Sequence, residues 1–173
     1  MHPLLLHPDC AEGPVKAVSA DIETTSGGCR ARFRLQGDIA AIKVPPHAAS
    51  ARADHLWKTT CLEIFWQPHG GKSYREFNLS PSSRWASYDF DDYRLNSRDA
   101  AVDAIAISTS RTDSELVLEA SIASDLPVPA DIALTAIVED AEGTIQYWAL
   151  AFADGKPDFH NTTCRMITLE NRL

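Results

Sequence analysis

Residues 54–94 read DHLWKTTCLEIFWQPHGGKSYREFNLSPSSRWASYDFDDYR, and this stretch decides the fold of the chain. It holds three of the four tryptophans and three of the four tyrosines. Acidic and amide side chains are interleaved with these aromatic ones. Aromatic rings beside carboxylates are typical of a surface that binds a polar ligand, whereas a plain hydrophobic core lacks the acids.

Polar and apolar side chains alternate in three runs of this stretch, at Cys61–Gln67, Tyr74–Ser80 and Trp85–Phe90. Period-two alternation is typical of strands that bury one face. The links at Pro68–Ser73 and Pro81–Arg84 contain the residues that favour turns. The stretch therefore predicts a meander of three antiparallel strands.

The first turn sets the pairing of the first two strands. If Gln67 lies opposite Tyr74, then Phe65 lies opposite Glu76 and Glu63 lies opposite Asn78. A second pairing follows if Ser80 lies opposite Trp85 across the next turn. It places Asn78 opposite Ser87 and Glu76 opposite Asp89, so we expect one polar face that holds Glu63, Glu76, Asn78, Trp85, Ser87 and Asp89.

The opposite face of the meander is apolar. A slip of one residue would exchange the faces of a whole strand and bring polar side chains into the core, so the pattern favours this register. We expect this face to pack on a second sheet. Its side chains are Leu62, Ile64, Trp66, Phe77, Leu79, Ala86, Tyr88 and Phe90, with Arg75 near a strand end.

The rest of the chain repeats short alternating runs between turn formers, which indicates an all-β domain. We predict a two-sheet antiparallel β-sandwich, jelly-roll-like, that forms a single domain over residues 1–173. Helical periodicity is weak throughout. The further predicted strands are Val15–Glu23, Cys29–Leu35, Ile39–Val44, Ala104–Ser110, Glu115–Ala123, Ile132–Glu139, Tyr147–Phe152 and Arg165–Leu169.

Composition limits the classes of partner. A net charge of −8 over 173 residues disfavours nucleic acid and anionic membrane surfaces, because both need a basic face on the protein. No apolar run approaches the length of a membrane span. The first ten residues, MHPLLLHPDC, lack the pattern of a secretion signal, so we expect a cytoplasmic protein. The sequence does not indicate an oligomeric state.

The four cysteines are widely spaced and form no CxxC pair. In a cytoplasmic protein we expect them to be free thiols. They are Cys10, Cys29, Cys61 and Cys164.

Two interpretations of the polar face remain open. It is either a solvated outer face, which is common in sandwiches, or a binding surface. Solvated faces favour lysine and mixed charges, yet this face is acidic and contains no lysine. Clustered carboxylates repel one another unless a ligand, a cation or an arginine satisfies them, and this favours binding.

Three segments of the chain resemble the DOMON-like domains, whose sandwich is similar to that of the family-nine carbohydrate-binding modules. They are LWKTTCLEIFW at Leu56–Trp66, YREFNLSPSSRWASYDFDDYR at Tyr74–Arg94 and YWALAFADGKPDFHNTTC at Tyr147–Cys164. The chain looks most like a bacterial stand-alone subgroup. The resemblance implies two packed sheets with a ligand site on a sheet face or its rim loops, and a sugar or haem as ligand.

The sugar-binding relatives hold a saccharide between tryptophans and bind it with acidic and amide groups, which makes several residues candidates here by type. Trp57 lies in a polar neighbourhood and could stack on a sugar ring or close the end of the sandwich. Trp85 lies on the polar face and is the better candidate. Trp66 and Trp148 fall on apolar faces, so we expect both in the core.

The loop at Asp158–His160 offers a different kind of site. Asp158 and His160 could contact a ligand, and His160 could pair with Cys164 as a nucleophile. The alternative, which we favour, is that Asp158 and His160 hydrogen-bond the loop backbone and fix its conformation.

We predict a non-catalytic module that binds a small polar ligand, a carbohydrate or sugar derivative, with no cofactor and no metal. One alternative is a hydrolase that uses the carboxylates of Glu63 and Glu76, or the Cys164 and His160 pair. Another is a haem-binding redox carrier, for which Met166 and His160 would be the available ligands. The predicted ligand-binding residues are Glu63, Glu76, Asn78, Trp85, Ser87, Asp89, Trp57, Asp158 and His160.

Overall fold

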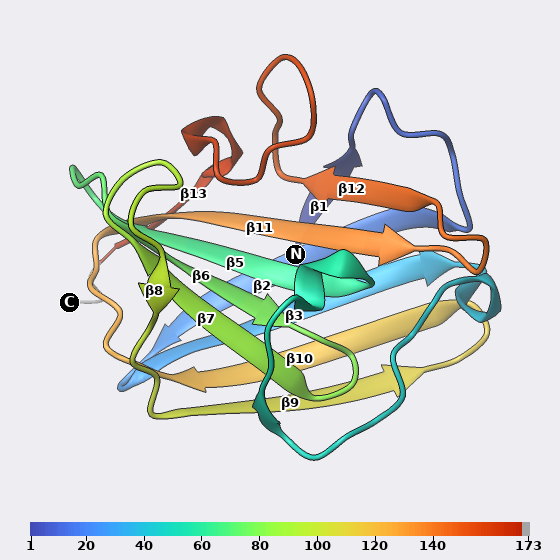
Figure 1. The fold of residues 1–173 in the computed structure, drawn as a ribbon, viewed down its shortest axis with the longest axis horizontal. Coiled ribbons are helices and arrows are strands. Elements are labelled where there is room, and N and C mark those ends of the chain that lie inside the picture. Colours follow the sequence, from blue (N-terminus) through green and yellow to red (C-terminus); the bar gives the residue numbers. More distant parts are fainter. Residues whose placement is uncertain (171–173) are drawn as a thin grey trace.

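Strands dominate residues 1–170, which the computed structural model describes (Figure 1). Three short 3-10 helices, η1 (Ile39–Ala41), η2 (Leu56–Lys58) and η3 (Thr162–Cys164), are the only helical segments in this range. No helix among these residues is long and apolar enough to span a membrane. The strands are β1 (His2–Leu6), β2 (Val15–Thr25), β3 (Gly28–Gly37), β4 (Ala51–Arg52), β5 (Cys61–Pro68), β6 (Tyr74–Leu79), β7 (Arg84–Phe90), β8 (Arg98–Asp99), β9 (Ala104–Arg111), β10 (Glu115–Ala123), β11 (Ala130–Glu139), β12 (Ile145–Ala149) and β13 (Ile167–Leu169).

The strands form one large curled sheet, a half-barrel, in the order β4-β7-β6-β5-β11-β12-β1-β2-β3-β10-β9. In addition, β13 pairs with β11 and β8 pairs with β7. The sheet is mixed because β4 runs parallel to β7, whereas the other pairs are antiparallel. The all-β prediction is confirmed. The predicted division into two separate sheets is not confirmed, because β1 pairs with β12 on one side and with β2 on the other and so joins the two halves.

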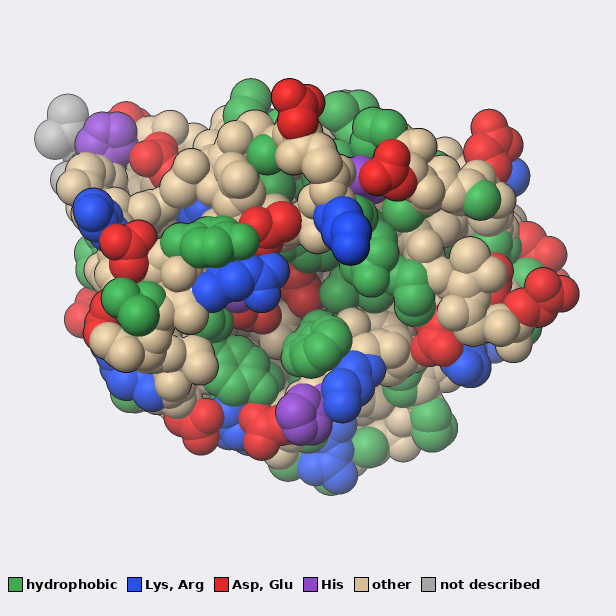
Figure 2. Space-filling model, turned by 45° about the horizontal axis from the view of Figure 1, so that its top comes forward, with side chains coloured by type: hydrophobic (Ala, Val, Ile, Leu, Met, Phe, Trp, Pro, Cys, Tyr) green, Lys and Arg blue, Asp and Glu red, His purple; other side chains and the backbone are tan. Residues whose placement is uncertain are grey.

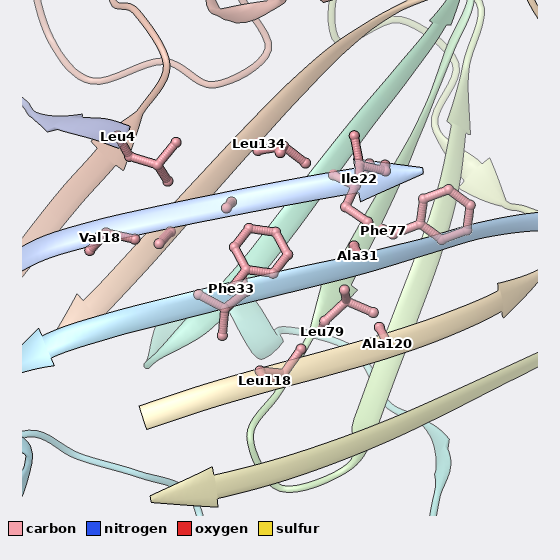
Figure 3. Close-up of a cluster of buried hydrophobic side chains, with 14 of the residues drawn as sticks. Leu4, Val18, Ile22, Ala31, Phe33, Phe77, Leu79, Leu118, Ala120 and Leu134 are labelled. Carbon is pink, nitrogen blue, oxygen red and sulfur yellow. The ribbon is translucent and has the colours of Figure 1, made fainter. Parts of the chain in front are cut away.

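The main core lies between the two halves of the curled sheet. Figure 3 shows Phe33 of β3 and Leu118 of β10 in the same buried cluster as Phe77 and Leu79 of β6. Alternation along each strand brings these side chains to the inner side, as predicted for the apolar face of β5 and β6. Trp66 and Trp148 also belong to this core, as predicted.

Other local predictions have mixed outcomes. The strands predicted at Ala104–Ser110 and Glu115–Ala123 are confirmed and pair as the hairpin β9–β10, and the four cysteines are free, as predicted. The predicted strand at Ile39–Val44 is wrong, because the segment begins as the 3-10 helix η1 and keeps only an isolated bridge between Ile42 and Asp140.

The predicted register of β5 and β6 is confirmed. Glu63 lies opposite Asn78 and Phe65 lies opposite Glu76. Alternate residues of a strand point to the same face of the sheet, so the side chains of Glu63, Glu76 and Asn78 lie together on one face.

The predicted register of β6 and β7 is wrong by one residue. Leu79, not Ser80, lies opposite Trp85. The turn is one residue tighter than expected: the backbone N–H of Ser80 donates to the carbonyl of Arg84 at 2.9 Å, and Ser83 takes a left-handed conformation with φ of 76°. A three-residue loop with a left-handed residue is a common hairpin connection.

This slip exchanges the two faces of β7. Trp85, Ser87 and Asp89 point to the side of the main core, while Ala86, Tyr88 and Phe90 point to the side of Glu76. The assignment of Trp85, Ser87 and Asp89 to the ligand face is therefore wrong.

The polar residues that the slip turns inward are satisfied there. Ser87 Oγ donates to the carbonyl of Glu76 at 3.0 Å. Arg75 donates to both carboxylate oxygens of Asp89, at 2.7 and 2.9 Å, and also to Ser124. These bonds offset the cost of burying polar groups, which was the argument against the slip.

Candidate functional site

A hollow of about 620 Å³ opens on the side of β5, β6 and β7 that faces away from the main core. Figure 2 shows it as a depression with acidic side chains at its floor and hydrophobic and basic side chains around it. The turn around η2, the loop after β7 and the segment between β12 and β13 supply its rim. Its lining is Asp54, His55, Trp57, Glu63, Phe65, Glu76, Tyr88, Phe90, Arg94, Ser97, Ile137, Tyr147, Pro157, Phe159 and His160.

Two carboxyl groups form the floor. Glu63 of β5 and Glu76 of β6 are only 3% and 6% exposed, and they are diagonal neighbours on adjacent strands. Thr135 of β11 donates to Glu63 Oε2 at 3.1 Å. Glu76 Oε2 lies 3.7 Å from His160 Nε2. Among the described residues, Glu76 accepts no hydrogen bond of normal geometry, so its carboxyl oxygens are available to a ligand.

The protonation of this pair follows from its burial. Loss of water raises the pKa of Glu76 to about 7, while Asn78 and Arg94 oppose the rise. The pKa of Glu63 is raised well above its usual range, first by burial and then by the charge of Glu76. The pair therefore retains a proton at neutral pH and offers both a donor and an acceptor.

Asn78 lies fully buried on the same face, beside the two carboxyl groups. It is near enough to Glu76 to lower the pKa of that carboxyl, although neither of its amide atoms makes a hydrogen bond of normal geometry within residues 1–170. Asn78 does not line the hollow. It therefore supports the floor from within the sheet.

His160 lies over the floor as a neutral donor. Tyr74 Oη is 2.7 Å from His160 Nδ1 and also accepts the backbone N–H of Arg94 at 3.2 Å. We assign the tyrosine proton to this bond, because Nδ1 is the acceptor within its reach, and this tautomer carries the His160 proton on Nε2, facing Glu76. Burial, followed by Arg94, lowers the pKa of His160 to about 4, so the ring is uncharged at neutral pH.

Asp158 joins two loops and does not line the hollow. It accepts from Arg94 Nη2 at 2.8 Å, from Tyr93 Oη at 2.7 Å and from the backbone N–H of His160 at 3.2 Å. These bonds favour the predicted alternative in which Asp158 fixes the loop. They also hold Arg94 and His160 at the edge of the hollow.

The structure does not form the predicted Cys164 and His160 pair. Cys164 Sγ donates to the carbonyl of Asp158 at 3.5 Å, and His160 Nδ1 is occupied by Tyr74. Burial raises the pKa of the Cys164 thiol to about 11. A protonated, buried thiol is a poor nucleophile, so this pair offers no hydrolase site.

Aromatic side chains line the walls. Trp57 on η2 is 48% exposed and stands at the rim, with Lys58 Nζ 5.7 Å from the centre of its ring. Tyr88 is held in place by donating to Asp54 Oδ1 at 2.7 Å. The other aromatic rings of the lining are Phe65, Phe90, Tyr147 and Phe159.

Several lining residues were not predicted. Tyr88 and Phe90 were assigned to the core because the expected register of β7 was one residue off. Arg94 ends the decisive stretch, and its charge beside acidic strands was the available signal. Tyr147 and Phe159 come from a distant strand and loop, and no local pattern connects them with β5 and β6.

Within residues 1–170, no three histidine, cysteine or acidic side chains gather in a way that could hold a metal ion. Met166, one of the two possible haem ligands, is 63% exposed and does not line the hollow. The predicted pair of haem ligands, Met166 and His160, therefore does not meet in the hollow.

No family model matches the sequence, and no curated protein matches it significantly. The fold is similar to a crystal structure from Bacteroides uniformis ATCC 8492, described as a "putative carbohydrate-binding protein". The TM-score is 0.67 at 15% sequence identity, and the alignment covers 94% of this chain and 82% of the other. At this identity the likeness establishes a shared fold.

Proposed function

We propose that the protein is a binding module for a small polar ligand, a carbohydrate or a sugar derivative. The observation that carries the proposal is the pair of nearly buried carboxyl groups, Glu63 and Glu76, at the floor of a hollow with aromatic walls. Convergent polar groups at the bottom of an apolar hollow are typical of small-molecule sites. The fold of the carbohydrate-binding neighbour supports the same class of ligand.

In this proposal the residues of the hollow have different roles in binding. Burial raises the pKa values of Glu63 and Glu76, so the pair keeps a proton at neutral pH and can both donate to and accept from sugar hydroxyls. His160 adds a donor at Nε2. Trp57 and Tyr88 offer ring faces on which the C–H face of a sugar can pack.

The family resemblance belongs to the same proposal. We infer a distant DOMON-like domain, similar to the family-nine carbohydrate-binding modules. The two facing halves of the curled sheet would then correspond to the two sheets of those sandwiches, with β1 as the added bridge.

The proposal is tested by titration calorimetry against a panel of glycans with the wild type and Trp57→Ala. We expect at least one glycan to bind, and the variant to bind it about two- to tenfold more weakly, since an aromatic contact contributes about 0.5–1.5 kcal/mol. Met166→Ala, an exposed residue outside the hollow, serves as the control and should bind as the wild type does. Absence of binding to every glycan, or equal binding by Trp57→Ala, would refute the proposal.

A second candidate is glycoside hydrolysis by the same pair. The observation in its favour is that Glu63 stays protonated while Glu76 titrates near neutrality, which is the split that an acid and a base require. The expected result is turnover of a chromogenic glycoside that falls at least a hundredfold in Glu76→Gln. Binding without turnover would leave the protein as a binding module.

A further inference from the structure

The acidic floor forms no ion pair with an arginine or lysine among the described residues. The nitrogen that approaches Glu76 is Nε2 of the neutral His160, at 3.7 Å. Arg94 lines the hollow and its charge lowers the pKa of both acids, but its guanidinium donates to Asp158. Arg52 is likewise engaged, with Asp54 and Asp99.

The floor also lacks hydrogen bonds that would satisfy it. Glu63 accepts one bond, from Thr135, and Glu76 accepts none of normal geometry within residues 1–170. Both side chains are more than nine-tenths buried and line the hollow. A buried carboxylate without a partner is costly, so a bound cation or hydrogen-bond donor would stabilise the ionised form of these groups.

The aromatic rings in the walls of the hollow favour a positively charged ligand over a neutral one. The rings of Trp57, Tyr88 and Phe65 border the same hollow as the two acids. Two of them already lie beside cations at the rim, with Arg52 Cζ 5.2 Å from the centre of the Tyr88 ring and Lys58 Nζ 5.7 Å from that of Trp57. Aromatic faces attract cations through their quadrupoles, and the attraction grows when water is excluded. A positively charged amine would meet carboxylates below and rings around it.

We propose that the ligand is an amino sugar whose protonated amino group binds between Glu63 and Glu76. This inference rests on the proposed function and narrows it to a charged class of saccharide. The ammonium group donates to both carboxylates, and the sugar ring packs toward Trp57. No covalent step is involved.

Binding of the ammonium group changes the protonation of the floor. The pair retains a proton at pH 6 in the free protein, because burial raises both pKa values. A nearby positive charge favours the ionised carboxylates. The ligand therefore displaces a proton into the solvent as it binds.

The test uses three β-1,4-linked disaccharides that differ only at C2: cellobiose with a hydroxyl, N,N′-diacetylchitobiose with an acetamido group, and fully deacetylated chitobiose with an amine. At pH 6 we expect the amine to bind the wild type at least tenfold more tightly than either neutral sugar. Calorimetry in two buffers of different ionisation enthalpy should show proton release with the amine.

Two variants locate the effect. Glu76→Gln keeps the shape of the side chain and should remove the preference for the amine. Glu119 lies on the exposed face of β10 and, within residues 1–170, pairs only with Arg32, so Glu119→Gln should leave the preference unchanged.

The outcomes separate the two proposals. Equal binding of the neutral and the charged disaccharide, or no proton release, overturns the amino-sugar inference and leaves a saccharide module. Failure of the whole glycan panel overturns the proposed function itself. Because the disaccharide series is measured on the wild type, a folding defect in Glu76→Gln does not affect this decision.

Discussion

Trp66→Ala is expected to lower the free energy of unfolding by about 3–5 kcal/mol, the range for removing a buried tryptophan or phenylalanine. Trp66 is 1% exposed and lies in the main core between the two halves of the sheet. Its Nε1–H donates to the carbonyl of Pro127 at 2.8 Å. The substitution therefore leaves a cavity and also removes the donor to the Pro127 carbonyl.

Chemical denaturation followed by circular dichroism measures this loss. Since domains of this kind are stable by about 5–15 kcal/mol, a substantial part of the total disappears. Trp57→Ala is the matched control and should change stability by less than about 1 kcal/mol, because half of its surface is already exposed. A loss below 1 kcal/mol in Trp66→Ala would contradict the assignment of this face to the core.

Glu76→Gln is expected to become more stable relative to the wild type as the pH rises from 5 to 8, by about 2.5 kcal/mol in all. The pKa of Glu76 is about 7 in the folded protein against 4.5 in the unfolded chain. Between these values the folded state binds more protons than the unfolded state. The wild type therefore loses stability as the pH rises, and glutamine, which does not titrate, does not.

His160 titrates in the opposite sense over part of the same range. Its pKa falls from 6.5 to about 4 on folding, so the unfolded chain takes up a proton first as the pH falls below 6.5. The stability that depends on neutral His160 is present above that pH and is lost toward pH 4. The two slopes oppose each other between pH 4.5 and 6.5. The difference between variant and wild type reports Glu76 together with the effect of its charge on Glu63.

Denaturation of both proteins at pH 5, 6, 7 and 8 gives that difference. Glu119→Gln, whose carboxylate is exposed, should run parallel to the wild type at every pH. A constant offset between Glu76→Gln and the wild type would show that the carboxyl of Glu76 is not buried as the structure has it.

Residues 54–94 show how much of the structure side-chain alternation alone predicts. Alternation predicted three strands, the buried face of Leu62, Ile64 and Trp66, and the pairing of Glu63 with Asn78, all of which the structure confirms. It failed at β7, where the turn is one residue tighter than expected. Asp89 was judged too polar for the inner side, yet Arg75 makes that position acceptable.

The sequence by itself determined the all-β class, most strand positions and the neighbourhood of Glu63, Glu76 and Asn78, because side-chain alternation is a local property of each strand. Tertiary structure alone decided the rest. It set the register of β7, made β1 the bridge between the two halves, and placed the segment with Phe159 and His160 over the two acids. These outcomes depend on turn geometry and on contacts between residues far apart in the chain, which a period-two pattern does not encode.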